Sequence, residues 1–235
     1  AVAGKVNRGA VIRQATGAFA RVPPGPAATE QPPPPPPKGP RLDFVRDEQS
    51  QTSFRLTFPT VPEVHPDFTA LSAVRRVLED GLSSRLPFNV IEKRGLAYSL
   101  GATVEAFHDA GSFEIDGAAA PLKVADTVRE VLRTVDTLRA GKISVEEMRR
   151  ARVRYRMAVE SQQDFPGDLL GWFAGEELFR PPKSFAARCR EVEALTIAQL
   201  VRVCRLYFRP ERLLAVAVGP RECERTLRRA ITAWR

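Results

Sequence analysis

The stretch KRGLAYSLGATVEAFHDAGSFEIDG, residues 93–117, decides the fold class of this chain. Apolar and polar residues alternate over Tyr98–Phe107 and again over Ser112–Gly117, which is the period of a half-buried β-strand. Between them, His108–Gly111 supplies the Asp-Ala-Gly turn chemistry of a hairpin. The sequence therefore predicts an antiparallel hairpin, with a tyrosine, Tyr98, at the entrance to its first strand.

Strand and helix patterns continue on both sides of this hairpin. Before it we expect a strand over Ser53–Phe58, a helix capped by Asp67, and a helix opened by Ser83 or Ser84 that ends near Arg94–Gly95. After it we expect a helix from Pro121 to Gly141, a helix opened by the Ser144–Glu147 capping box, two or three helices over about 164–208, and a closing strand over Leu213–Val218. Strands at both ends with helices between them predict an α+β fold, a largely antiparallel (mixed) sheet with helices packed on one face.

Composition narrows the function classes only slightly. The chain has 235 residues and a formal charge of +8, which permits nucleic acid, an anionic membrane surface or acidic peptides as partners and selects none of them. The Lys and Arg residues form no run of five, so we interpret them mainly as solvated helix faces. The three cysteines have no paired spacing, and no apolar run approaches the roughly 18 residues of a membrane span.

A proline-rich segment divides the chain. Residues 23–40 include six successive prolines, Pro32–Pro37, and predict an extended spacer, with a ligand for an SH3 or WW domain as the alternative. AVAG at Ala1–Gly4 and the helical pattern ending in Phe19 resemble AVAVG at Ala215–Gly219 and the helical pattern ending in Trp234. This repeat predicts three parts: residues 1–22, the last strand and helix of a preceding homologous half-domain; residues 23–40, a linker; and residues 41–235, a second half-domain. The alternative is chance similarity among common residues.

Common catalytic motifs are absent from the sequence. It holds no phosphate-binding glycine loop, no G-x-S-x-G and neither H-E-x-x-H nor H-x-x-E-H. The two histidines, His65 and His108, lie in a proline-rich turn and in the hairpin loop, and no second ligand stands near either one in the sequence. Zinc needs three or four nitrogen, sulfur or oxygen ligands, so we predict no metal site in this chain.

Three segments carry a resemblance to a known family. SSRLPFNVIEKRGLAYSLGATVEAFHDAGSFEIDGAA, ISVEEMRRARVRYRMAVES and REVEALTIAQLVRVCRLYFRPERLLAVAVGP resemble, in this order, the C-terminal non-zinc half-domain of pitrilysin/insulinase-type (inverted zincin) zinc metallopeptidases. The resemblance implies the half-domain fold of mitochondrial processing peptidase and a homologous zinc-bearing half, in the same precursor or in a separate subunit. It also implies that zinc and its H-x-x-E-H motif lie in that other half, outside this chain.

The resemblance assigns roles to particular residues. In the family, an arginine and a tyrosine seven residues apart contact substrate carbonyls and stabilise the oxyanion, and Tyr98 stands at the tyrosine position. The arginine position holds Ile91, and Arg94 is three residues away, so the loss of the cation costs on the order of 3–4 kcal/mol of transition-state stabilisation if the analogy holds. Peptide would add along the strand edge at Tyr98, Ser99 and Gly101. The alternative for Tyr98 is simple packing against a helix.

Three functions remain open at this point. The first is the closing half of a zinc metalloendopeptidase, which encloses and orients peptide opposite the zinc and is inactive alone. The second is a catalytically inactive member that serves as a structural or assembly subunit. The third, a basic module that binds nucleic acid, is disfavoured because aromatic and basic residues do not alternate. Compartment stays open between bacterial envelope, periplasm and cytoplasm, because the chain starts at Ala1 in the pattern of a strand end, as a processed product or excised fragment would.

Overall fold

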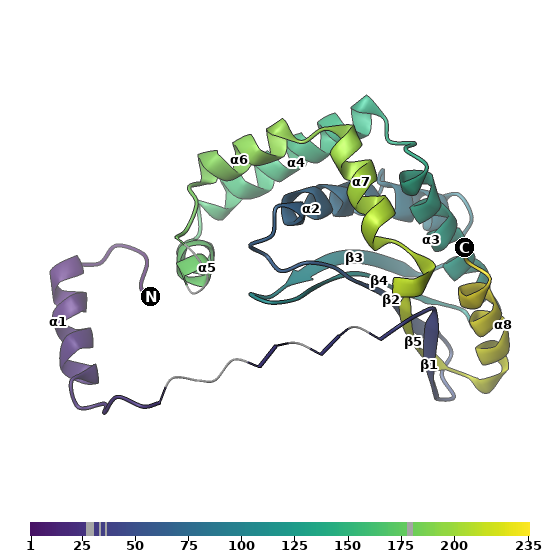
Figure 1. Ribbon diagram of the computed structural model, residues 1–235, viewed down its shortest axis with the longest axis horizontal. Helices are drawn as coiled ribbons and strands as arrows, with labels where there is room; N and C mark the ends of the chain where they lie inside the picture. The colour runs from purple at the N-terminus through teal and green to yellow at the C-terminus, as the bar shows by residue number, and fades with distance from the viewer. Residues whose placement is uncertain (27–30, 33, 36, 178–180) are drawn as a thin grey trace.

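The computed structural model describes residues 1–26, 31–32, 34–35, 37–177 and 181–235. Five strands form one mixed sheet in the order β1-β5-β2-β4-β3. Their bounds are β1 Arg41–Arg46, β2 Thr52–Pro59, β3 Ser99–Ala106, β4 Gly111–Ala119 and β5 Leu214–Gly219. β1 runs parallel to β5, and the other neighbours are antiparallel. The predicted hairpin is therefore present as β3 and β4, at one edge of the sheet (Figure 1).

Side-chain alternation gives the sheet one covered face and one open face. Along β2 the residues Phe54, Leu56 and Phe58 are buried, whereas the alternate residues Ser53 and Arg55 are exposed. The buried set faces the helices α2 (Asp67–Leu78), α3 (Val124–Arg139), α7 (Ile197–Tyr207) and α8 (Arg221–Thr232). This arrangement confirms the predicted α+β architecture with helices on one face.

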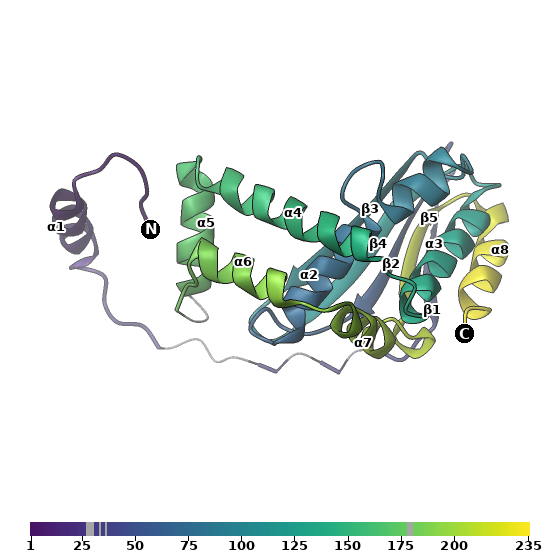
Figure 2. The same cartoon turned by 90° about the horizontal axis from the view of Figure 1, so that it is seen from above.

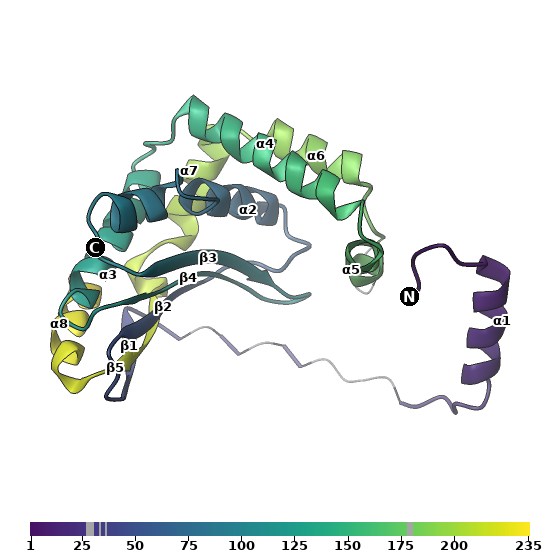
Figure 3. The same ribbon diagram turned by 180° about the vertical axis from the view of Figure 1, so that it is seen from behind.

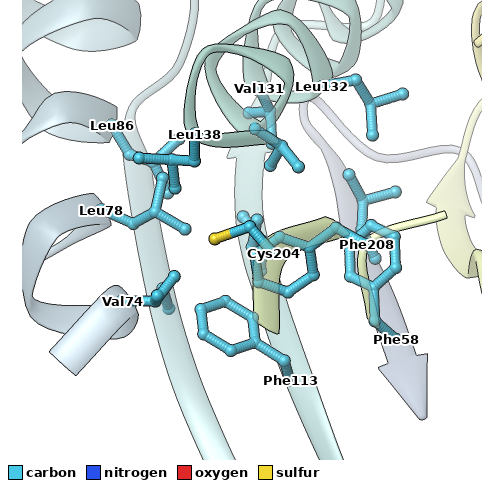
Figure 4. Close-up of a cluster of buried hydrophobic side chains, with 14 of the residues drawn as sticks. Phe58, Val74, Leu78, Leu86, Phe113, Val131, Leu132, Leu138, Cys204 and Phe208 are labelled. Atoms are coloured by element: carbon cyan, nitrogen blue, oxygen red, sulfur yellow. The ribbon is translucent and has the colours of Figure 1, made fainter. Parts of the chain in front are cut away.

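The core fills the space between the sheet and these helices. Phe208 stands at its centre, with ring centroids 5.1 Å from Phe58 and 4.8 Å from Phe113. Figure 4 shows leucines and valines from α2 and α3 closing over these rings, together with the buried thiol of Cys204 from α7. Burial raises the pKa of that thiol to about 12, so Cys204 behaves as a small apolar core residue.

Three helices project from the body as an arm. The arm consists of α4 (Val145–Gln162), α5 (Pro166–Glu177) and α6 (Phe185–Ala194). Figures 1 and 2 show α4 and α6 side by side over α2, with α5 joining their far ends. α4 begins at the predicted capping box, in which Ser144 and Glu147 each bind the other's backbone N–H. The arm thus overhangs the edge of the sheet that β3 forms.

Several local predictions were wrong. The strand β1 was not predicted. Asp67 is the first residue of α2 rather than its cap, because its carboxylate binds Arg202 and Tyr207 instead of the helix backbone.

The segment after Ser84 is a π-helix over Pro87–Glu92, closed by a bond from Lys93 N to Phe88 O, five residues back. The serine hydroxyl accepts from the Asp80 N–H and donates to the Gly81 carbonyl, so it does not cap this helix. α3 begins at Val124, and Pro121 lies in the turn before it.

The N-terminal part stands apart from the sheet. α1 (Arg8–Phe19) buries none of its residues, and Figures 1 and 3 show it beyond the proline-rich segment. Residues 1–3, expected to continue a strand, are not a strand in the described chain, where they have no sheet neighbour. The predicted polyproline spacer falls partly on residues 27–30, 33 and 36, which lie outside the described residues. Within the described ranges, no helix has both the length and the hydropathy needed to span a membrane.

Candidate functional site

Tyr98 lies at the entrance to the edge strand. Its backbone N–H donates to Ala118 O at 2.9 Å, which fixes the residue beside the end of β4. Tyr98 is 65% exposed, so most of its surface is not used in packing against a helix, which was the alternative interpretation. An exposed phenol fixed by its backbone to a rigid hairpin is suited to donate a hydrogen bond to a bound group.

Ser99 and Gly101, the other two predicted contact residues, lie on the side of β3 that faces away from the core. Ser99 pairs with Ala118 and Gly101 pairs with Asp116, and strand alternation places both on the face opposite the buried Ala102, the face that no helix of the described chain covers (Figure 1). A Cβ built on Gly101 would lie 3.5 Å from the Asp116 carboxylate oxygens, which is ordinary contact. Because Gly101 has no side chain, the surface of the open face beside Asp116 is low at this position. In the described chain β3 pairs with β4 alone, so its other edge is free.

The position of the family arginine is apolar. Ile91 is half-buried and packs against the core from the π-helix. Arg94 faces α3, where its Nε lies 3.4 Å from Glu130 Oε2. Ile91 therefore carries no charge at the family's arginine position, and the guanidinium of Arg94 lies beside Glu130.

The histidines hold no metal-binding arrangement in the described chain. His65 Nδ1 accepts the backbone N–H of Asp67 at 3.1 Å, which ties it into the start of α2. His108 Nε2 lies 3.8 Å from the carboxylate of its neighbour Asp109 in the hairpin loop. Over the described ranges, no three His, Cys, Asp or Glu side chains gather as a metal site would require. The residues present do not fit zinc.

Arg85, in the SSRL segment, forms a clamp that sequence reasoning missed. Its guanidinium donates to Glu147 Oε1 at 2.6 Å and Oε2 at 2.8 Å, to Thr137 Oγ1 at 2.7 Å, and to the Lys142 carbonyl. Burial alone would raise the pKa of Glu147, but hydrogen bonds from Arg85 and Ser144 outweigh it and lower that pKa to about 2. Arg85 therefore joins the segment before the π-helix to α3, to α4 and to the turn between them.

A second buried carboxylate anchors α2. Asp67 accepts from Arg202 and from the Tyr207 hydroxyl at 2.8 Å. Burial raises its pKa, but these hydrogen bonds and the Arg202 charge have the larger combined effect and lower it. The burial of Tyr207 and its bond to Asp67 raise the pKa of the phenol to about 12. This pair joins α2 to α7. Tyr207 therefore has a structural role, whereas the side chain of Tyr98 is exposed.

Most of the chain matches a known family of domains. Residues 1–155 match a family model described as the peptidase M16 inactive domain. The chain belongs to this family. Membership in the peptidase M16 inactive-domain family confirms the recognition of a non-zinc half-domain, which the segments around Tyr98 had indicated.

Bacterial relatives of this M16 domain carry zinc protease names. An uncharacterized zinc protease of Mycobacterium tuberculosis is 26% identical over 209 residues, which covers 88% of this chain and 48% of the relative. The zinc protease PqqE of Helicobacter pylori is 25% identical over 157 residues, covering 66% of this chain and 35% of the relative. The chain spans about half the length of the first of these, so it is homologous to part of a zinc protease.

Solved structures with the same fold include further members of the M16 family. A protease from Helicobacter pylori superposes with a TM-score of 0.84 at 21% identity, covering 93% of this chain and 54% of that one. A peptidase M16 inactive domain from Pseudomonas fluorescens gives 0.79 at 24% identity, covering 92% and 52%. A chain of complex III2 from Candida albicans gives 0.69 at 14% identity, covering 81% and 49%. At these identities the likeness shows the fold alone.

Proposed function

We propose that this chain closes a peptide chamber opposite a homologous half-domain that bears the zinc. The observation that carries the proposal is Tyr98, an exposed phenol fixed at the entrance to a free strand edge in an M16 inactive domain. When peptide is bound, the Tyr98 hydroxyl donates to a substrate carbonyl, and the free edge of β3 at Ser99 and Gly101 pairs with the peptide main chain. In this proposal the zinc and its chemistry belong to the other half, and the match to an inactive domain supports that assignment.

A second candidate function has its own support. Ile91 packs against the core at the position where the catalytic members of the family carry an arginine, so half of the family's carbonyl-binding pair is missing. The fold also occurs in a chain of complex III2. A structural or assembly subunit that has lost catalysis accounts for both observations, and activity of the intact product separates it from the first candidate.

The test measures zinc content and hydrolysis of unfolded peptides by the intact product, purified with any stably bound partner, beside the 235-residue chain alone. We expect about one zinc per assembly and cleavage by the assembly, with neither in the chain alone. Tyr98→Phe should then lower kcat by about 100-fold, the usual effect of losing one oxyanion donor. An assembly without zinc and without cleavage supports the structural subunit instead.

The matched control is Tyr207→Phe, which also removes a single phenol oxygen. Its hydroxyl is buried and donates to Asp67, a bond that joins α7 to α2. Tyr207→Phe should lower the free energy of unfolding and leave kcat unchanged. Equal losses of kcat in both variants would show that Tyr98 acts through stability, and would contradict its proposed role.

A further inference from the structure

A cavity of about 610 Å³ lies beneath the arm. We call it the arm cavity; its walls come from α2, the edge strand β3 and the three arm helices (Figure 2). Its apolar lining consists of Phe68, Val104, Tyr155 and Trp172. The proposed function leaves this cavity unused, because Tyr98, Ser99 and Gly101 are not among its lining residues.

The aromatic walls are held in fixed positions. The Trp172 indole donates from Nε1 to Lys183 O at 2.8 Å, and its ring centroid lies 4.4 Å from that of Phe185. The guanidinium carbon of Arg76 lies 5.4 Å from the centroid of the Tyr155 ring. A pocket with such fixed walls loses little side-chain entropy when a ligand enters.

The charged residues of the lining already have partners. Arg75 pairs with Glu79 at 3.3 Å, Arg76 pairs with Asp80 at 2.9 Å, and the buried Arg188 pairs with Glu176. Each cation is thus compensated by a carboxylate close to it. A phosphate or an acidic side chain would have to compete with these carboxylates, so the cavity suits an uncharged ligand.

Glycines of α5 leave part of the cavity empty. Gly171 and Gly175 both line it, one helical turn apart, although glycine is among the poorest helix formers. Glycine inside a helix usually allows close approach of another element, yet a Cβ built at either position meets no atom within 4 Å. What the two glycines provide here is room.

The free edge of β3 reaches the same space. Val104 brings the free edge of β3 to the cavity wall, and such an edge pairs with extended main chain.

We propose that the arm cavity is a side-chain subsite for one large apolar residue, aromatic by preference, of an extended neutral peptide. The side chain lies among Phe68, Tyr155 and Trp172, and the peptide main chain leaves along the edge of β3. The inference rests on the proposed function in that the ligand is peptide, and it adds which residue of that peptide this half selects.

Binding is measured on the 235-residue chain, so no zinc or cleavage is needed. The probes are two blocked neutral pentapeptides, Ala-Ser-Phe-Ser-Ala and the same sequence with alanine at the centre. We expect the phenylalanine peptide to bind at least about tenfold more tightly, because only its ring fills the apolar walls. Trp172 fluorescence reports occupancy in the Trp234→Phe background, and calorimetry on the unaltered chain gives the same comparison if that core substitution disturbs folding.

Two leucine substitutions in one helix test the location. Gly175→Leu places a side chain in the cavity and should weaken binding of the phenylalanine peptide at least about tenfold while the chain stays folded, since leucine favours the helix. Gly167→Leu in the same helix also enters open space but does not line the cavity, and should leave binding unchanged.

Three outcomes would overturn the subsite: equal affinity for the two peptides, equal binding by the two leucine variants, or no binding of either peptide at millimolar concentration. None of these outcomes touches the proposed function, which depends on zinc and cleavage in the intact product. Conversely, a product without zinc or cleavage whose chain still selects the phenylalanine peptide would support the subsite and contradict the peptidase role.

Discussion

Glu147 is a carboxylate whose ionisation stabilises the folded chain. Its pKa in the folded chain is about 2, against an ordinary 4.5, because the hydrogen bonds from Arg85 and Ser144 outweigh its burial. A lowered folded-state pKa gives stability that is fully present above pH 4.5 and is lost as the pH falls toward 2. We therefore expect Glu147→Gln to lower the free energy of unfolding by about 3 kcal/mol at pH 7. Urea unfolding across pH should show that difference shrinking as the acid limit is approached.

Glu146, one residue earlier, provides the matched control. Its pair with Arg149 lies on the surface, where solvent screens the attraction, so Glu146→Gln should leave the urea midpoint unchanged at every pH. If the Glu147 and Glu146 variants instead gave parallel pH curves, the clamp at Arg85 would not be the source of the stabilisation.

At the residue scale, the sequence predicts what is local and misses what is distant. The Ser144–Glu147 capping box lies within four residues, and it was predicted and confirmed. The partner that gives Glu147 its low pKa is Arg85, which stands 62 residues earlier and has no local signature. The place of Tyr98 was predicted from a family resemblance, and its exposure became known only when the backbone was placed beside β4.

At the element scale, the turn between α3 and α4 depends on one glycine. Gly141 has φ +82°, and the bonds from Gly141 N to Leu138 O and from Lys142 N to Thr137 O close the end of the helix. A Cβ there meets nothing closer than 3.9 Å, so the penalty of Gly141→Ala comes from the backbone alone. We expect it to lower the free energy of unfolding by about 1 kcal/mol. The midpoint of urea unfolding should fall while its slope stays the same.

A glycine-to-alanine substitution in α5 should not lower the free energy of unfolding. Gly171 lies inside a helix and has open space around its missing Cβ, so Gly171→Ala improves helix propensity without a clash. Its urea midpoint should equal or exceed that of the unchanged chain. A loss of stability at Gly171 similar to that at Gly141 would mean that glycine serves close packing in the arm.

Elements with a local period were predicted, and those defined by distant partners were not. The hairpin β3–β4 and the helix α2 follow their apolar periods to within a residue or two. β1 was missed because it is a short edge strand whose partner β5 lies at the far end of the chain. The residues of the π-helix at Pro87–Glu92 would also be accepted in an α-helix. The π-helix differs by a hydrogen bond that spans five residues instead of four, and packing rather than local sequence determines that bond.

At the scale of the whole molecule, α1 has an apolar face but no core to cover. Ile12 is 48% exposed and Phe19 is 71% exposed, and α1 buries none of its residues. If residues 1–22 end a preceding half-domain, as the repeat with residues 215–234 predicts, these side chains pack against that other half. Ile12→Ser with Phe19→Ser should then leave the urea unfolding of the 235-residue chain unchanged.

The same double substitution gives a different expectation in the intact product. There it should lower the free energy of unfolding of a preceding half-domain by about 2–5 kcal/mol for each buried apolar side chain lost, because α1 would close that core as α8 closes this one. Unfolding followed by Trp172 and Trp234, which report only this half, should stay the same in both settings. A fall in stability of the 235-residue chain itself would place α1 on its own sheet and contradict the division at the proline-rich segment.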